Sequence, residues 1–178
     1  SIKDSQDFST LINADYYKEN RISALIEITY VVTCNNDDYF SVLFTIKDAA
    51  DGNESISYDA NVFSREEGKA DSTYTLPQLL KILSYTEDDE WLQERQTAKA
   101  DTLVRGMVWD MIRENKANVE YYDWFTEEVL EDSFHPEEDF YLDESGEPVF
   151  FLQPGAAADE RFGLITFPIP LDDILDEL

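Results

Sequence analysis

The sequence has few of the residues on which common catalytic and metal sites depend. Cys34 is the single cysteine among 178 residues, so no disulfide can close within the chain and a cysteine-based metal cage is excluded. His135 is the single histidine, and no Gly-x-Ser-x-Gly motif accompanies it. Six glycines leave little room for a phosphate-binding loop or a dinucleotide fingerprint. We therefore expect no cofactor, no bound metal and no enzyme activity.

Basic residues are scarce as well. The chain has 13 Lys and Arg against 40 Asp and Glu, which gives a formal net charge of −27. Such a surface repels DNA, RNA and anionic lipid, because these are bound through Lys and Arg that neutralise phosphate. No apolar run approaches the roughly 20 residues that span a bilayer. The charge favours a cationic partner, but an acidic surface that serves solubility alone has the same composition.

The abundance of carboxylates weakens any argument for a paired-acid hydrolase. Chance alone supplies many acid pairs, and the carboxyl separation that glycosidases require cannot be read from sequence. The acidic runs at 137–139 and 172–173 are therefore interpreted as solvated faces. Residues 48–54 offer oxygen atoms at the wrong spacing for a calcium loop.

The first half of the chain has the period of β-strands. Apolar and polar residues alternate over 24–32, 39–46 and 56–62, while 35–38 and 48–54 are rich in turn-forming Asn, Asp and Gly. Three strands joined by short turns predict an antiparallel meander. Before it, Phe8, Leu11, Ile12 and Tyr16 have helical spacing, which predicts a leading helical segment over 1–21.

Helical spacing follows the meander, and strands return at the end. Thr75 and Thr86 are the predicted starts of a short and a long helix, and a third helix is predicted near 124–134. A hairpin at 140–152, a strand at 164–167 and a helical turn to residue 178 complete the chain. We expect an α+β fold in which an antiparallel β-meander is followed by helices and a C-terminal β-hairpin plus strand, with the helices packed on one face of the sheet. Residues 22–178 would form one domain, with halves at 22–85 and 86–178.

Several segments resemble a known family in their order and spacing. They are Asn36-Asp37 before residues 39–42, the stretch from 63 to 80, Phe140-Tyr141-Leu142, Gly146, residues 149–152, Pro154, Gly163 and residues 165–171. Over roughly 22–178 this pattern resembles the RsiV-like family, the extracytoplasmic domain of lysozyme-responsive anti-sigma factors. A related domain accompanies polysaccharide deacetylases of the PdaC type. The family's Gly-Gly-Ala-His loop is missing, since residues 48–53 have neither the paired glycines nor the histidine.

The resemblance implies a sensor domain on the bacterial cell surface that binds a basic protein such as lysozyme. Its membrane anchor would precede Ser1, where the chain begins without Met. The oligomeric state stays open. The predicted contact segment is the small-residue loop between the last two strands, because it links edge-type strands. Its candidate partner-binding residues are Gln153, Pro154, Gly155, Asp159, Glu160, Arg161 and Phe162.

Two other functions stay open at this point. An accessory module that binds peptidoglycan beside a wall-modifying enzyme would need exposed aromatic residues, for which Tyr121, Tyr122 and Trp124 are the candidates. A hydrolase would have to use a pair among the many carboxylates, and the sequence singles out none.

Overall fold

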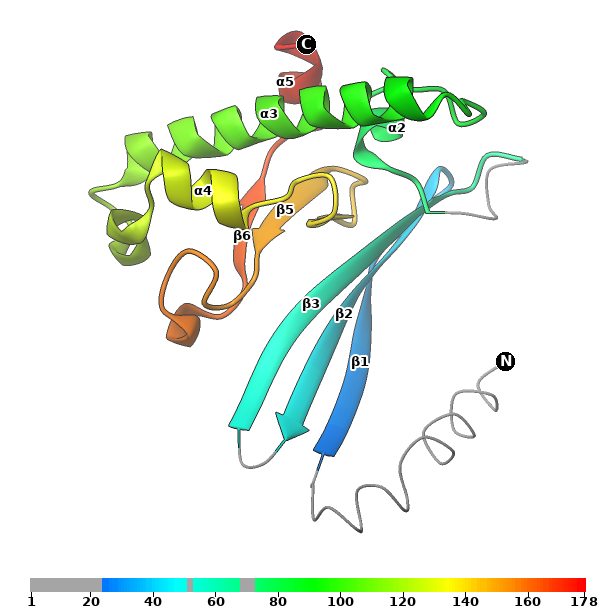
Figure 1. Cartoon of the computed structure of the whole chain (residues 1–178). Coiled ribbons are helices and arrows are strands. Elements are labelled where there is room, and N and C mark those ends of the chain that lie inside the picture. The colour runs from blue at the N-terminus through cyan, green and yellow to red at the C-terminus, as the bar shows by residue number, and fades with distance from the viewer. Residues whose placement is uncertain (1–23, 51–52, 68–72) are drawn as a thin grey trace.

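A computed structural model describes residues 24–50, 53–67 and 73–178. It has two antiparallel sheets of three strands each, and the helices lie between the sheets in chain order (Figure 1). The predicted α+β order of meander, helices and C-terminal strands is therefore confirmed. The helical segment predicted over 1–21 lies outside the described residues. Within the described ranges, no helix is long and apolar enough to cross a bilayer.

The meander consists of β1 (Ala24–Asn35), β2 (Tyr39–Ala50) and β3 (Asn53–Ser64). The Asn36 side chain forms the first turn, because its Oδ1 accepts the N–H groups of Asp38 and Tyr39 at 2.9 and 2.8 Å. The second turn is shorter than the predicted stretch 48–54. Asp48 pairs with Ser55 and Ala50 with Asn53, so the strand pairing continues through this polar stretch to the ends of both strands.

The first two helices of the described residues begin at polar caps. Helix α2 (Leu76–Leu79) starts at Thr75 as predicted, and Gln78 Oε1 accepts the Thr75 N–H at 2.9 Å. Helix α3 (Glu90–Asn115) starts at Asp89, not at the predicted Thr86. The Asp89 carboxylate accepts the N–H of Leu92, whereas the Thr86 hydroxyl is hydrogen-bonded to Ser84.

The remaining elements enclose the core. They are η1 (Glu120–Trp124), α4 (Glu127–Ser133), β4 (Phe140–Leu142), β5 (Pro148–Leu152), η2 (Glu160–Phe162), β6 (Ile165–Pro168) and α5 (Leu171–Asp176). Trp124 and Phe125, which we predicted in the third helix, precede α4, because Thr126 caps it by accepting the N–H of Val129. One face of α3 is fully buried against the second sheet, through Ala100, Val104, Val108 and Ile112.

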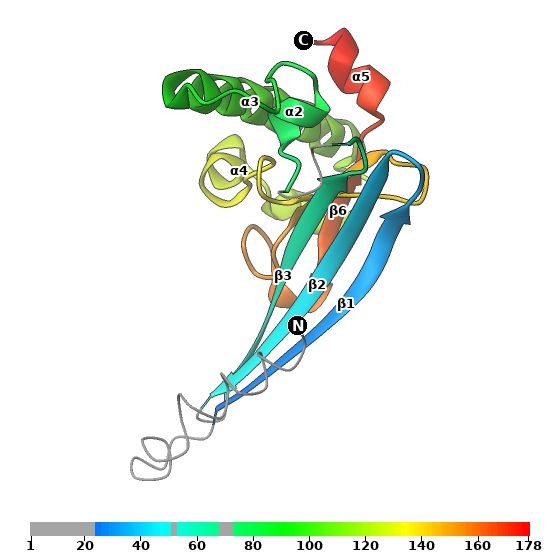
Figure 2. The ribbon, with the colours of Figure 1, turned by 90° about the vertical axis from the view of Figure 1, so that its right-hand side faces the viewer.

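The meander contacts the second sheet near one end, through Ser41. The hydroxyl of Ser41, which is fully buried, accepts the N–H of Leu142 at 3.1 Å and the hydroxyl of Thr33 at 3.0 Å. Beside it Cys34 is 1% exposed, and burial raises the pKa of its thiol, which disfavours the reactive thiolate. The other end of the meander reaches away from the helices (Figure 2).

Candidate protein-binding surface

The predicted contact residues lie in the connection between β5 and β6, here called loop 153–163. Two glycines shape its backbone: Gly155 has φ of 79° and Gly163 has φ of 65°, values that side chains with a Cβ rarely adopt. Between them Asp159 opens η2, because its carboxylate accepts the N–H of Arg161 at 3.0 Å. The loop therefore has a defined path set by its own sequence.

Contacts with η1 hold the far side of loop 153–163. The Arg161 guanidinium donates to Glu120 Oε1 at 3.2 Å and lies 4.8 Å from the centroid of the Phe162 ring. The Phe162 ring in turn packs against Tyr121, with centroids 5.1 Å apart. An exposed ion pair of this kind contributes little to stability. Together with the contact between Phe162 and Tyr121, it places the loop beside η1.

Gln153 has a different role from the other predicted residues. Its side-chain amide donates to the carbonyl oxygen of Tyr58 at 2.8 Å and accepts the Tyr58 N–H at 2.9 Å. It also donates to Asp139 Oδ1 at 3.2 Å. Within this structure the amide of Gln153 is used to attach the loop to the edge of β3.

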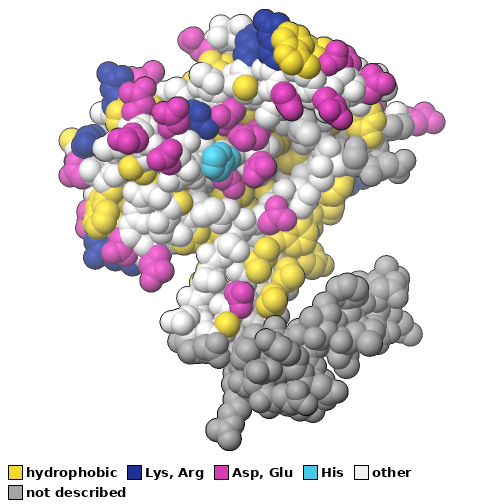
Figure 3. All heavy atoms as spheres, in the orientation of Figure 1, with side chains coloured by type: hydrophobic (Ala, Val, Ile, Leu, Met, Phe, Trp, Pro, Cys, Tyr) yellow, Lys and Arg dark blue, Asp and Glu magenta, His cyan; other side chains and the backbone are white. Residues whose placement is uncertain are grey.

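Exposed carboxylates lie on loop 153–163, on η1, which contacts this loop, and on α4, which follows η1 in the chain. We call this the acidic surface; its members are Glu120, Asp123, Glu127, Glu128, Glu131, Asp132, Asp159 and Glu160. Within the described part of the chain, Arg161 pairs with Glu120, and Lys116 pairs with Asp123 at 3.7 Å. Acidic side chains also dominate the visible face of the helical part (Figure 3). The arrangement suits a cationic partner.

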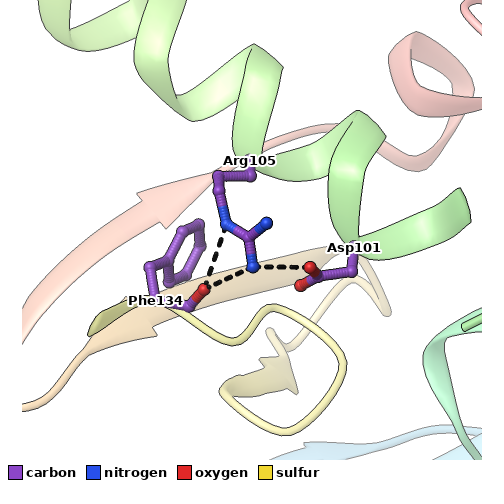
Figure 4. Close-up of polar contacts among 3 residues, drawn as sticks. All are labelled: Asp101, Arg105 and Phe134. Carbon is purple, nitrogen blue, oxygen red and sulfur yellow. Dashed lines mark hydrogen bonds and ion pairs between the residues drawn. The ribbon is translucent and has the colours of Figure 1, made fainter. Parts of the chain in front are cut away.

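A second carboxylate cluster, which the sequence did not reveal, lies between α3 and the segment after α4. Arg105 donates to the Phe134 carbonyl from Nε at 3.3 Å and from Nη2 at 3.0 Å, and it pairs with Asp101 one turn earlier on α3 (Figure 4). The only sequence signal was the helical spacing of Asp101 and Arg105. Nothing in the sequence placed Phe134 beside them.

Glu137 completes this cluster. Its Oε2 atom and Oδ1 of Asp101 are both buried and have no hydrogen-bond donor. Burial, followed by the contact with Asp101, raises the pKa of Glu137 to about 7. A protonated Glu137 would supply the donor that these two oxygen atoms lack. An open pocket of about 540 Å³ adjoins the pair and is lined in part by Glu90 and Glu94. Across the described part of the chain, no three or more His, Cys, Asp or Glu side chains are grouped to hold a metal ion.

The aromatic residues considered for glycan binding are mostly packed inside. Tyr122 is 8% exposed and stacks on Phe167, with ring centroids 6.4 Å apart. Tyr121 packs against Tyr122 and Phe162. Trp124 alone of the three is an exposed aromatic ring, at 52%.

The sequence matches no model of a protein family, and no curated protein matches it.

Proposed function

We propose that the chain is a non-catalytic binding domain for a basic protein. The observation that carries this proposal is the acidic surface, in which exposed carboxylates lie on a loop of fixed conformation and on the helices η1 and α4. A site that is already ordered loses less conformational entropy on binding than a flexible one. Complementary charge also accelerates encounter with a cationic protein.

The resemblance to the RsiV-like family makes the partner more specific. It supports a lysozyme as the basic protein, and a role as the extracytoplasmic sensor of an anti-sigma factor at the bacterial cell surface. The formal net charge of −27 fits this partner, because animal-type lysozymes are strongly basic proteins that an acidic domain attracts.

Titration calorimetry against a basic animal-type lysozyme, at low and at physiological salt, tests the proposal. We expect saturable binding near one-to-one, weakened but not abolished by salt, because part of the energy comes from screened charges. Absence of binding at low salt would contradict the lysozyme proposal. Binding that vanishes at physiological salt would show non-specific attraction between opposite charges.

Two charge-matched variants locate the binding surface. Asp159→Asn with Glu160→Gln removes two charges from loop 153–163, and Asn retains the capping function at 159. Asp172→Asn with Asp173→Asn removes two exposed charges from α5. We expect the first pair to weaken lysozyme binding about tenfold, and the second pair to have a smaller effect. Equal effects would mean that only net charge matters.

A glycan-binding accessory module is the second candidate, because Trp124 presents an exposed ring at the end of η1. The test is binding of soluble peptidoglycan fragments to the chain and to Trp124→Ala, with the exposed Trp91→Ala as the matched control. Fragment binding that requires Trp124, together with no binding of lysozyme, would favour this candidate over the first.

A further inference from the structure

A groove lies between α3 and the C-terminal elements β6 and α5. It is open and has a volume of about 630 Å³, and its lining comes from α3 on one side and from the segment between Pro168 and Glu177 on the other. Helix α5 lies beside α3 in both views of the ribbon (Figure 1 and Figure 2). Ligand pockets have volumes of about 300–1,000 Å³, so the groove has room for a ligand. We call it the α3–α5 groove.

The floor of the α3–α5 groove is apolar. Leu103, Met107 and Met111 follow one another at intervals of four residues, so they form one ridge along α3. Each of them packs against the core and is half-buried, which leaves part of its side chain to the groove. Pro168 and Pro170 line the groove from the other side, and both are exposed. A ligand with apolar side chains would remove this surface from water.

A glycine and two methionines give the groove room and adaptability. Gly106 has nothing within 4 Å of an added Cβ, so at this point α3 presents backbone alone to the groove. Met107 and Met111 are the two methionines of the whole chain, and both lie here. Unbranched methionine side chains adjust to apolar ligands of different shape, as in peptide-binding surfaces that accept several partners. The lining therefore suits a peptide.

Exposed carboxylates border this apolar floor on both sides. Asp110 and Glu114 are one turn apart on α3, and Asp173 and Glu177 are one turn apart at α5. Arg113 pairs with Asp110 at 3.0 Å. Among the described residues, no Lys or Arg lines the groove itself. The charge at its border is therefore negative, and it complements a cationic ligand.

We propose that the α3–α5 groove binds a basic amphipathic peptide. Its apolar side chains lie on the ridge of α3, and its Lys or Arg side chains lie beside the bordering carboxylates. A helical peptide fits best, because its Lys residues one turn apart match the one-turn spacing of Asp110 and Glu114. A polar cation would leave the apolar floor in water, and an acidic peptide would be repelled. The groove shares no residue with the acidic surface, so this proposal does not depend on lysozyme binding.

Methyl NMR of the full chain with isotope-labelled methionine locates the bound peptide, because both methionines line the groove. The probe is a synthetic peptide of Leu and Lys, about four helical turns long, with every Leu on one helix face. The control peptide has the same composition in an order that gives no apolar face. At physiological salt we expect the probe to shift both methyl signals in a saturable way, with the control at least about tenfold weaker. Unshifted methyl signals, or equal affinity for the two peptides, would overturn the proposal.

Charge-matched variants test the carboxylates. Glu114→Gln with Glu177→Gln removes one charge from each side of the groove, and both positions are exposed. Asp159→Asn with Glu160→Gln removes two charges from loop 153–163 and is the control. By calorimetry at physiological salt, we expect the first variant to bind the amphipathic peptide about tenfold more weakly and the control to change its affinity less than about twofold. Equal loss in the two variants would mean that net charge alone attracts the peptide, and would overturn the proposal.

Discussion

The side-chain amide of Gln153 pairs with both main-chain groups of Tyr58, the N–H at 2.9 Å and the carbonyl at 2.8 Å. These residues are 95 positions apart in sequence. The contact occupies hydrogen-bonding groups on the outer edge of β3, which an edge strand otherwise presents to other chains. It thus attaches the long meander to the loop that follows β5.

Replacing Gln153 by Ala should therefore destabilise the fold. The edge groups of Tyr58 and the carboxylate of Asp139 lose their partner, so we expect the free energy of unfolding to fall by about 1–2 kcal/mol. Urea unfolding gives the free energy, and hydrogen exchange should show faster exchange of the Tyr58 amide. Asn118→Ala, at an exposed position, serves as the control and should change stability by less than about 0.5 kcal/mol. An unchanged Tyr58 exchange rate would contradict this role.

Ser41 should be sensitive to loss of its hydroxyl. Ser41→Ala leaves the N–H of Leu142 without an acceptor in a fully buried position, which costs about 1–3 kcal/mol of unfolding free energy. Ser57→Ala, exposed on β3, is the matched control. The measurement is again urea unfolding, and equal stability of the two variants would show that water or a rearranged backbone replaces the lost bond.

Glu137 makes stability depend on pH in a definite direction. Burial raises its pKa from 4.5 to about 7, so between these values the folded state binds more protons than the unfolded state. The contribution of Glu137 to the free energy of unfolding is therefore fully present below about pH 4.5 and is lost as the pH rises through about 7. Burial raises the pKa of Asp139 as well, which acts in the same direction.

Glu137→Gln isolates this contribution, because the neutral amide has no proton to lose. We expect the variant to be more stable than the unchanged chain at pH 8, by about 1 kcal/mol, and to lose less stability between pH 5 and 8. Glu138→Gln, an exposed neighbour, is the control. Thermal unfolding as a function of pH measures both, and parallel curves for the Glu137 variant and the unchanged chain would contradict the raised pKa of Glu137.

Replacing either of two glycines by alanine should change the stability of the fold, in opposite directions. Gly106 lies inside α3 with nothing within 4 Å of an added Cβ, so Gly106→Ala should stabilise the fold by about 0.5–1 kcal/mol. Gly146 has φ of 89° in the β4–β5 turn, and an added Cβ would lie 3.1 Å from Asn36 Nδ2. Gly146→Ala should therefore destabilise by about 1–2 kcal/mol. Melting temperatures that shift in the same direction would contradict one of these assignments.

Local features of the chain were readable from its sequence. The alternation at 24–32 and 39–46 predicted β1 and β2, the stripe through Val104 and Val108 predicted the buried face of α3, and Thr75 with Pro77 predicted the start of α2. The predictions that were wrong concern where helices and strands begin and end. Thr86 and the residues after 48 looked like a cap and a turn, but a carboxylate at Asp89 caps better and a continuous ladder extends both strands.

The sequence by itself determined the elements and their order, because helix and strand periods and capping residues act over a few positions. Only the tertiary structure decided how those elements meet. It placed Gln153 against Tyr58, Asp101 beside Glu137, and Arg161 on Glu120. These contacts join residues far apart in the chain, and their energies depend on burial and on distances that no local pattern encodes. For the same reason no local pattern shows which carboxylates, among 40, are exposed on an ordered loop and which are buried in contact with each other.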